Sequence, residues 1–220
     1  MLRSLSGSPV LLYTSSTLWR LNSTEWQQVG GCEQIKGNVL DIAVASDGAV
    51  WVATGLALAR FDGKLWTTHD RLVHSVAIGA GDTLWAVGWE GTQGSNYVAR
   101  LDGSDWAKTL DRSLGSLVVT PDGQVWGVTG EGELTHFDGQ DWTFPQLPAD
   151  LDSSVHALAV APDGALWASG GDRIARFDGV NWIVYPSTKG VEAIVFAVDG
   201  SLWLATSNGA AHFQPPIGQP

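Results

Sequence analysis

Residues 47–66 read DGAVWVATGLALARFDGKLW, and residues 163–182 read DGALWASGGDRIARFDGVNW. In both stretches two tryptophans lie 15 residues apart, and each tryptophan stands three residues after the glycine of an Asp-Gly pair. Asp-Gly between β-rich runs is typical of a hairpin turn, because glycine accepts the positive φ that such turns require. The two stretches therefore predict short β-strands separated by tight turns.

The same phrases recur along the whole chain. Ten of the 12 tryptophans fall into two interlocking series, which are Trp51, Trp85, Trp126, Trp167 and Trp203, and Trp26, Trp66, Trp106, Trp142 and Trp182. Their spacing of about 40 residues divides the chain into six repeat units, 1–40, 41–74, 75–115, 116–156, 157–192 and 193–220. A repeat of this length is typical of propellers and other repeat architectures.

Each unit reads as four short strands. In the second unit these are DIAVAS, AVWVAT, LALARF and LWTTH. No stretch has the periodicity of a capped helix, so the sequence predicts an all-β fold. We expect a single β-propeller domain, 1–220, of four-stranded antiparallel blades. Six blades are the main prediction and five the lesser alternative. The last unit lacks a fourth strand, so the N-terminal segment Leu2–Leu5 is expected to pair into the last blade and close the ring.

The pattern DGxxWxAT followed by xGxARFDGxxW resembles the two-component regulator propeller repeats of bacterial ligand-sensing proteins. The resemblance covers essentially the whole chain and is weakest in the first unit. A more distant similarity extends to tectonin-type lectin propellers and to propellers of the virginiamycin B lyase type, whose blades also carry DGxxW. The resemblance implies a β-propeller fold, and its sensor-type members imply a platform that binds a ligand or a protein.

Charge and cysteine content exclude several kinds of partner and site. The net charge of −11 argues against nucleic acid and anionic membranes, which bind chiefly through Lys and Arg. The single cysteine, Cys32, cannot form an internal disulfide or a thiolate zinc site. The N-terminus has no sustained apolar region of a signal peptide, so the expected location is cytoplasmic. No metal or cofactor is predicted.

Acidic residues gather at the Asp-Gly turns. In an up-and-down meander the first and third turns of each blade share one face, which places eleven acidic residues there, including Asp47, Asp62, Asp163 and Asp178. The structural interpretation is turn chemistry, with pairing to Arg20, Arg60, Arg100 and Arg176. The functional alternatives are an acidic docking surface or calcium binding, although the dense ligand spacing of a calcium loop is absent.

The opposite face carries the variable loops. The third unit has an insertion there, residues 88–97 (GWEGTQGSNY), with Trp89, Glu90 and Tyr97. An exposed tryptophan in a glycine-rich loop is a candidate for stacking on a sugar or for anchoring a protein. The alternative is that Trp89 folds over its own blade as a local cap.

Charged and imidazole side chains also reach this face from the segments that return to the next blade. The binding candidates among them are Arg71, His74, Arg112, His156 and Lys189. His74 and His156 stand 11 residues before Trp85 and Trp167, so they occupy the same repeat position near the channel mouth. The alternatives are a ligand-facing pair and ordinary solvated loop histidines.

No catalytic motif accompanies these candidates. The sequence has no GxSxG, phosphate-binding loop or HExxH motif. The preferred hypothesis is a non-catalytic platform that binds a protein or small ligand through this loop face. A tectonin-like glycan-binding lectin is the first alternative. A lyase with His74 or His156 as acid–base group is the second.

Overall fold

The computed structural model describes residues 2–3, 11–13, 17–22, 25–90, 95–102, 105–151, 155–187, 190–197 and 199–214. In these residues 23 strands form six sheets, five of four strands and one of three. The helical segments there are α1 (Cys32–Ile35) and a 3-10 turn at Ala80–Asp82. The chain is all-β, as predicted.

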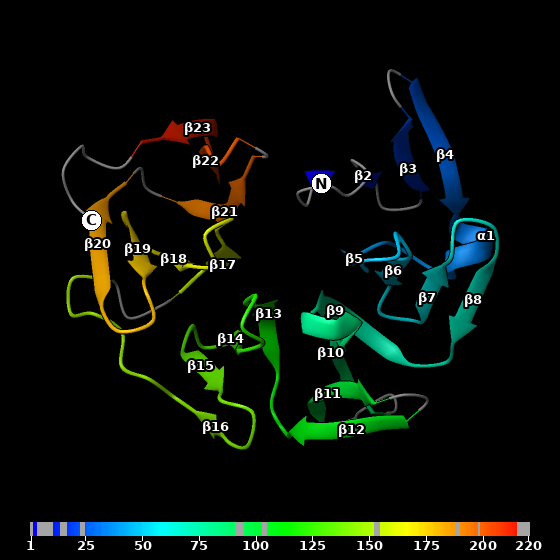
Figure 1. Cartoon of the computed structure of the whole chain (residues 1–220), viewed down its shortest axis with the longest axis horizontal. Coiled ribbons are helices and arrows are strands. Elements are labelled where there is room, and N and C mark those ends of the chain that lie inside the picture. The colour runs from blue at the N-terminus through cyan, green and yellow to red at the C-terminus, as the bar shows by residue number, and fades with distance from the viewer. Residues whose placement is uncertain are drawn as a thin grey trace. The chain divides into compact units, whose positions relative to one another are not determined.

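Consecutive strands are neighbours in every sheet, and Figure 1 labels β2 to β23. The first sheet contains β1 (Leu2–Arg3), β2 (Leu11–Tyr13), β3 (Thr17–Asn22) and β4 (Glu25–Gly31). The second contains β5 (Asp41–Val44), β6 (Val50–Ala53), β7 (Leu58–Phe61) and β8 (Trp66–His69). The third contains β9 (Leu72–Ile78), β10 (Leu84–Trp89), β11 (Asn96–Asp102) and β12 (Asp105–Leu110).

The remaining sheets follow the same meander. The fourth contains β13 (Leu114–Val119), β14 (Val125–Thr129), β15 (Leu134–Phe137) and β16 (Trp142–Thr143). The fifth contains β17 (Ala157–Val160), β18 (Leu166–Gly170), β19 (Arg173–Phe177) and β20 (Trp182–Pro186). The sixth contains β21 (Val191–Phe196), β22 (Leu202–Thr206) and β23 (Gly209–Phe213). The chain divides into two compact units, Met1–Leu114 and Gly115–Pro220, with three sheets in each.

Both faces of a central sheet are buried, which explains why its strands read as nearly continuous apolar runs. Successive side chains of a strand point to opposite faces. On β6, Val50 and Val52 pack with Leu18 of the first sheet, whereas Trp51 packs with Val73 of the third. The repeated tryptophan therefore fills the layer between one sheet and the next.

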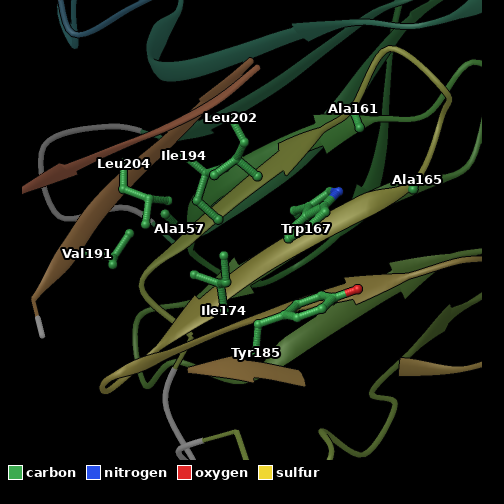
Figure 2. Close-up of a cluster of buried hydrophobic side chains, with 10 residues drawn as sticks. All are labelled: Ala157, Ala161, Ala165, Trp167, Ile174, Tyr185, Val191, Ile194, Leu202 and Leu204. Carbon is green, nitrogen blue, oxygen red and sulfur yellow. The ribbon is translucent and has the colours of Figure 1, made fainter. Parts of the chain in front are cut away.

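The second unit uses the same packing. Figure 2 shows Trp167 and Tyr185 of the fifth sheet in one cluster with Ile194 and Leu202 of the sixth. Trp51, Trp85, Trp126 and Trp167 are only 4–8% exposed, but Trp203 in the last sheet is 43% exposed. The repeated tryptophan is thus buried in four members of this series and exposed in the fifth.

The Asp-Gly turns have the structural role expected of them. Asp62 accepts hydrogen bonds from the backbone N–H groups of Leu65 (2.8 Å) and Lys64 (2.9 Å), which lower the pKa of its carboxyl group. Gly63 has a φ of +96°, a conformation that favours glycine. Across the first turns, Arg60 pairs with Asp47 at 3.2 Å and Arg176 with Asp163 at 3.0 Å.

The predicted pairing of the N-terminus with the last sheet is wrong for the described residues. β1 pairs antiparallel with β2, Leu2 opposite Leu12 and Arg3 opposite Leu11, so it completes the first sheet. Antiparallel neighbours along the chain can be joined by a short connection, and β2 is the next strand after β1. Leu5 lies outside the described residues. The third, fourth and sixth sheets begin two or three residues before the predicted repeat boundaries.

Candidate binding site

Apolar side chains from two loops and from the end of β10 converge at the end of the first unit that lies opposite the Asp-Gly turns. The centre is Gly55, in the turn between β6 and β7. A Cβ atom added to Gly55 would lie 3.1 Å from Leu40 Cδ1 and 3.5 Å from Trp89 Cη2. Leu56, next to Gly55, packs on Gly37 and is 67% exposed, and Leu40 is 48% exposed. We define the loop-end patch as Leu40, Gly55, Leu56, His74 and Trp89.

The turn that carries Gly55 and Leu56 is held by a buried threonine. The Thr54 hydroxyl accepts the N–H of Ala57 at 2.9 Å and donates to the carbonyl of Lys36 at 3.0 Å. Gly55 N–H also donates to the carbonyl of Val73 in the third sheet at 2.7 Å. The patch is therefore supported by hydrogen bonds from two directions, which keeps the ordering cost of binding small.

Trp89 packs on His74, and a strand irregularity places the two together. The rings stack with centroids 5.3 Å apart and an interplanar angle of 20°. The register of β9 with β10 shifts at this point, so that Gly88 pairs with Val73 and Val87 with Ser75. His74 is the extra residue of this bulge. Gly88 is required here, because a Cβ atom would lie 2.1 Å from the carbonyl oxygen of Leu72.

A buried carboxylate fastens the two sheets beneath the patch. Asp41, at the start of β5, accepts hydrogen bonds from the Ser75 hydroxyl (2.9 Å) and the Val76 N–H (3.1 Å) of β9. It also accepts the N–H of Ile42 at 2.9 Å. Burial lowers the pKa of the His74 imidazole, and the Asp41 charge opposes this shift. His74 is therefore neutral at pH 7, and the patch presents an uncharged aromatic surface.

The other predicted residues of the first unit have different surroundings. Tyr97 is 4% exposed and belongs to the core. The Arg71 guanidinium lies 5.1 Å from the centre of the Trp106 ring, a cation–π contact. Glu90 is exposed, and its N–H donates to the carbonyl of Ser95 at 3.2 Å. Arg112 is exposed in the segment between β12 and β13. The structure thus stacks Trp89 on His74, places Tyr97 in the core opposite Gly88, and packs Arg71 on Trp106.

The second unit holds the remaining candidates. His156 lies just before β17 and is exposed. Its backbone N–H donates to the carbonyl of Ser169 at 2.9 Å. Lys189 and the tip of the insertion, residues 91–94, lie outside the described residues. In the part of the chain that the structure describes, no three His, Cys, Asp or Glu side chains are placed to hold a metal ion.

A groove lies between the first two sheets. This groove of about 440 Å³ is lined by Gln27, Gln28, Val29, Gly30, Gln34, Phe61, Lys64 and Trp66. Trp66 stacks on Phe61 at 5.0 Å, and a Cβ atom at Gly30 would lie 2.5 Å from its Cζ2 atom. Its indole N–H donates to the carbonyl of Val29 at 3.0 Å. The Trp66 ring is thus occupied by protein contacts rather than offered for stacking on a sugar.

Sequence reasoning missed Leu40 and Leu56, although the repeat contains a signal for both. Leu40 stands 11 residues before Trp51, the position of His74 and His156 in their own units. Leu56 stands five residues after Trp51, where other units have Glu131, Asp172 and Asn208. An apolar residue at a turn position that is otherwise polar marks a surface suited to binding.

No protein-family model matches the sequence, and no curated protein sequence matches it. Solved structures do match. Virginiamycin B lyase from Staphylococcus aureus superposes with a TM-score of 0.73 at 14% identity, over 98% of this chain and 84% of the lyase chain. The extracellular domain of the hybrid two-component system BT4673 from B. thetaiotaomicron gives 0.72 at 13% identity, over 100% of this chain and 32% of that one.

A third match is YCF48 bound to D1 peptide, with a TM-score of 0.68 at 16% identity, over 96% of this chain and 76% of that one. These structures and the six sheets confirm the predicted fold class, a β-propeller with four-stranded antiparallel blades, and six blades fit the described residues. At these identities the likeness concerns the fold.

The cytoplasmic location expected from the N-terminus is corrected by these matches. The BT4673 match is an extracellular domain. PorZ, described as a surface component of the type-IX secretion system of Porphyromonas gingivalis, matches with a TM-score of 0.71 at 17% identity, over 97% of this chain and 40% of that one. None of the helices in the described residues is long and apolar enough to cross a membrane.

Proposed function

We propose that this protein is a non-catalytic binding platform whose loop-end patch receives an apolar segment of a partner protein. The observation that carries the proposal is the convergence of Leu40, Leu56 and Trp89 around Gly55. Exposed leucines gathered beside an aromatic ring are typical of a protein interaction surface. The uncharged His74 beneath Trp89 extends the apolar surface.

The chemistry of the patch favours a peptide-like partner over a sugar. Leucine side chains give apolar contact area and no hydrogen bonds, whereas a sugar needs several polar partners. His74 is one of the two acid–base candidates of the lyase alternative, with His156, and one face of its imidazole is covered by Trp89. A fold neighbour, YCF48, is described as bound to a peptide, which supports the proposal at the level of the fold. We place the platform on the extracellular or periplasmic side, in keeping with the BT4673 and PorZ structures.

Selection of displayed random peptides on the immobilised protein tests the proposal. We expect enriched peptides with apolar and aromatic residues, and at least tenfold weaker binding to Trp89→Ala, since residues that anchor an interface often contribute about 2 kcal/mol or more. Leu65→Ala is the matched control, because Leu65 is 70% exposed at the opposite end of the second sheet. Binding of the selected peptides that is equal in Trp89→Ala and wild type would remove the patch as the site.

A further inference from the structure

The last sheet differs from the other five at its outer edge. Within the described residues it ends at β23, whereas each of the other sheets continues into a fourth strand. An exposed strand edge presents unpaired N–H and C=O groups, which is a template for another strand. β23 pairs with β22 through five residues, from Leu202 opposite Phe213 to Thr206 opposite Gly209.

The other sheets show what kind of strand fits this position. The fourth strand of the second, fourth and fifth sheets begins with a tryptophan opposite the final phenylalanine of the third strand, as in Phe61 with Trp66. The ring centroids lie 5.0 Å apart in that pair, 5.3 Å in Phe137 with Trp142 and 5.0 Å in Phe177 with Trp182. An aromatic residue opposite this phenylalanine is thus the recurring feature of the outer strand.

The sixth sheet has the phenylalanine of this aromatic pair, at the end of its third strand. Phe213 is the equivalent of Phe61 and Phe177, and it lies edge-on to Tyr185 (5.8 Å) and Trp167 (6.2 Å) of the fifth sheet. Phe213 remains partly exposed, and no described tryptophan pairs with it as the first residue of a fourth strand.

We propose that the outer edge of β23 binds an extended segment of a partner protein as a fourth, antiparallel strand, with an aromatic side chain opposite Phe213. Main-chain hydrogen bonds supply affinity in such strand addition, and the aromatic contact supplies specificity. This site belongs to the second unit and shares no residue with the loop-end patch. Its test is therefore independent of the proposed function.

The alternation of backbone bonds predicts which groups take part. Asp178 N–H donates to the carbonyl of Asn181, so these two residues form a hydrogen-bonded pair. Hydrogen-bonded and non-hydrogen-bonded pairs alternate along antiparallel strands. The next hydrogen-bonded pairs are therefore Arg176 with Ile183 and Ile174 with Tyr185 on β20. Because Phe213 is equivalent to Phe177, His212 and Ala210 are equivalent to Arg176 and Ile174. Their backbone N–H and C=O groups therefore point away from β22, toward the outer edge of β23. In a bound segment that pairs as β20 does, the residues equivalent to Ile183 and Tyr185 direct their backbone groups to β23, and those equivalent to Trp182 and Val184 direct theirs away.

A synthetic peptide with the sequence of residues 178–186, DGVNWIVYP, tests the proposal on the intact protein. We expect saturable binding by fluorescence anisotropy and slower amide hydrogen exchange at Ala210 and His212. N-methylation at the positions of Ile183 and Tyr185 should weaken binding at least tenfold. N-methylation at the positions of Trp182 and Val184 is the matched control and should have little effect.

Replacing Trp182 of the peptide by alanine should weaken binding at least tenfold, and so should Phe213→Ala in the protein. The peptide variants leave the protein unchanged, so they test the site even if Phe213→Ala does not fold. Absence of binding, equal loss with both pairs of N-methyl groups, or protection on β19 in place of β23 would overturn the proposal.

Discussion

The two units contain the same kind of antiparallel sheet, but the loops at the end opposite the Asp-Gly turns carry different side chains. In the first unit the repeat positions 11 residues before and four or five residues after Trp51 and Trp85 carry three large apolar residues among six, namely Leu40, Gly55, Leu56, His74, Trp89 and Glu90. In the second unit the same positions carry only polar residues or glycine, and all but Gly171 are exposed: Gly115, Gly130, Glu131, His156, Gly171, Asp172, Glu192, Ser207 and Asn208. The repeat therefore determines the backbone of both units, and the residues at its loop positions determine which unit has an apolar loop end.

The two units also fasten their sheets differently. In the first, the Asp41 carboxylate bridges β5 and β9. In the second, the Ser169 hydroxyl accepts the N–H of Ala157 at 3.1 Å and donates to the carbonyl of Val191 at 3.4 Å. A charged acceptor contributes more than a neutral hydroxyl, so the first unit depends more heavily on its bridge.

Asp41→Ala should have the largest effect. The substitution leaves the Ser75 hydroxyl and the buried N–H of Val76 without this acceptor, and we expect a loss of about 3 kcal/mol in the free energy of unfolding. Ser169→Ala in the second unit should cost about 1 kcal/mol, measured in the same way by urea denaturation. Equal losses in the two variants would contradict the difference between the bridges.

Gly88→Ala should rank second. The added methyl group would meet the backbone of Leu72, so the strands beneath His74 and Trp89 must separate, at a cost of roughly 1–3 kcal/mol. Gly130→Ala is the matched control in the second unit, because an added Cβ atom there has no neighbour within 4 Å. Thermal unfolding of both variants measures the difference, and an unchanged midpoint in Gly88→Ala would refute the close approach of β9 and β10.

Leu56→Asp introduces into the first unit the residue that stands at the equivalent position of the fifth sheet, Asp172. Because Leu56 is largely exposed, the free energy of unfolding of the protein should change by no more than about 0.5 kcal/mol. Binding of a selected peptide should weaken about tenfold, which isothermal titration calorimetry measures. Leu65→Asp carries the same charge change at the other end of the sheet and should leave the affinity unaltered.

The smallest expected effect is a pH dependence from His74. Its folded-state pKa lies below its ordinary value because of burial, so protonation favours the unfolded chain. Stability should be full above the unfolded-state pKa of about 6.5 and should fall as the pH drops below it. Asp41 on β5 opposes this loss. His74→Gln should flatten the dependence of the unfolding midpoint on pH between about 7.5 and 5.5, and an unchanged slope would exclude His74.

His136 also has a lowered pKa and is retained in the His74→Gln variant. Burial lowers the pKa of its imidazole too, while Asp138 and Asp122 oppose the shift. The residual slope of the variant is therefore expected to come in part from the fourth sheet, and His136→Gln measures that part separately.

The repeat allowed the fold to be predicted, because Asp-Gly turns and alternating apolar residues act locally. The role of Asp62 and Asp178 in their turns followed from the same local chemistry. The partner of the N-terminal strand did not, since Leu2–Arg3 carries too little pattern to select a register. The site was predicted only in part: Trp89 stood out because it breaks the tryptophan series, but its contact with His74 depends on a bulge that no local signal specifies.

Site-specific photo-crosslinking to a selected peptide shows directly whether the apolar loop end of the first unit is the binding surface. A photoreactive amino acid is placed in turn at positions 56, 65 and 172, all of which are exposed. We expect a cross-linked product from position 56 and none from positions 65 and 172. Cross-linking from position 172 or 65 with none from position 56 would contradict this expectation.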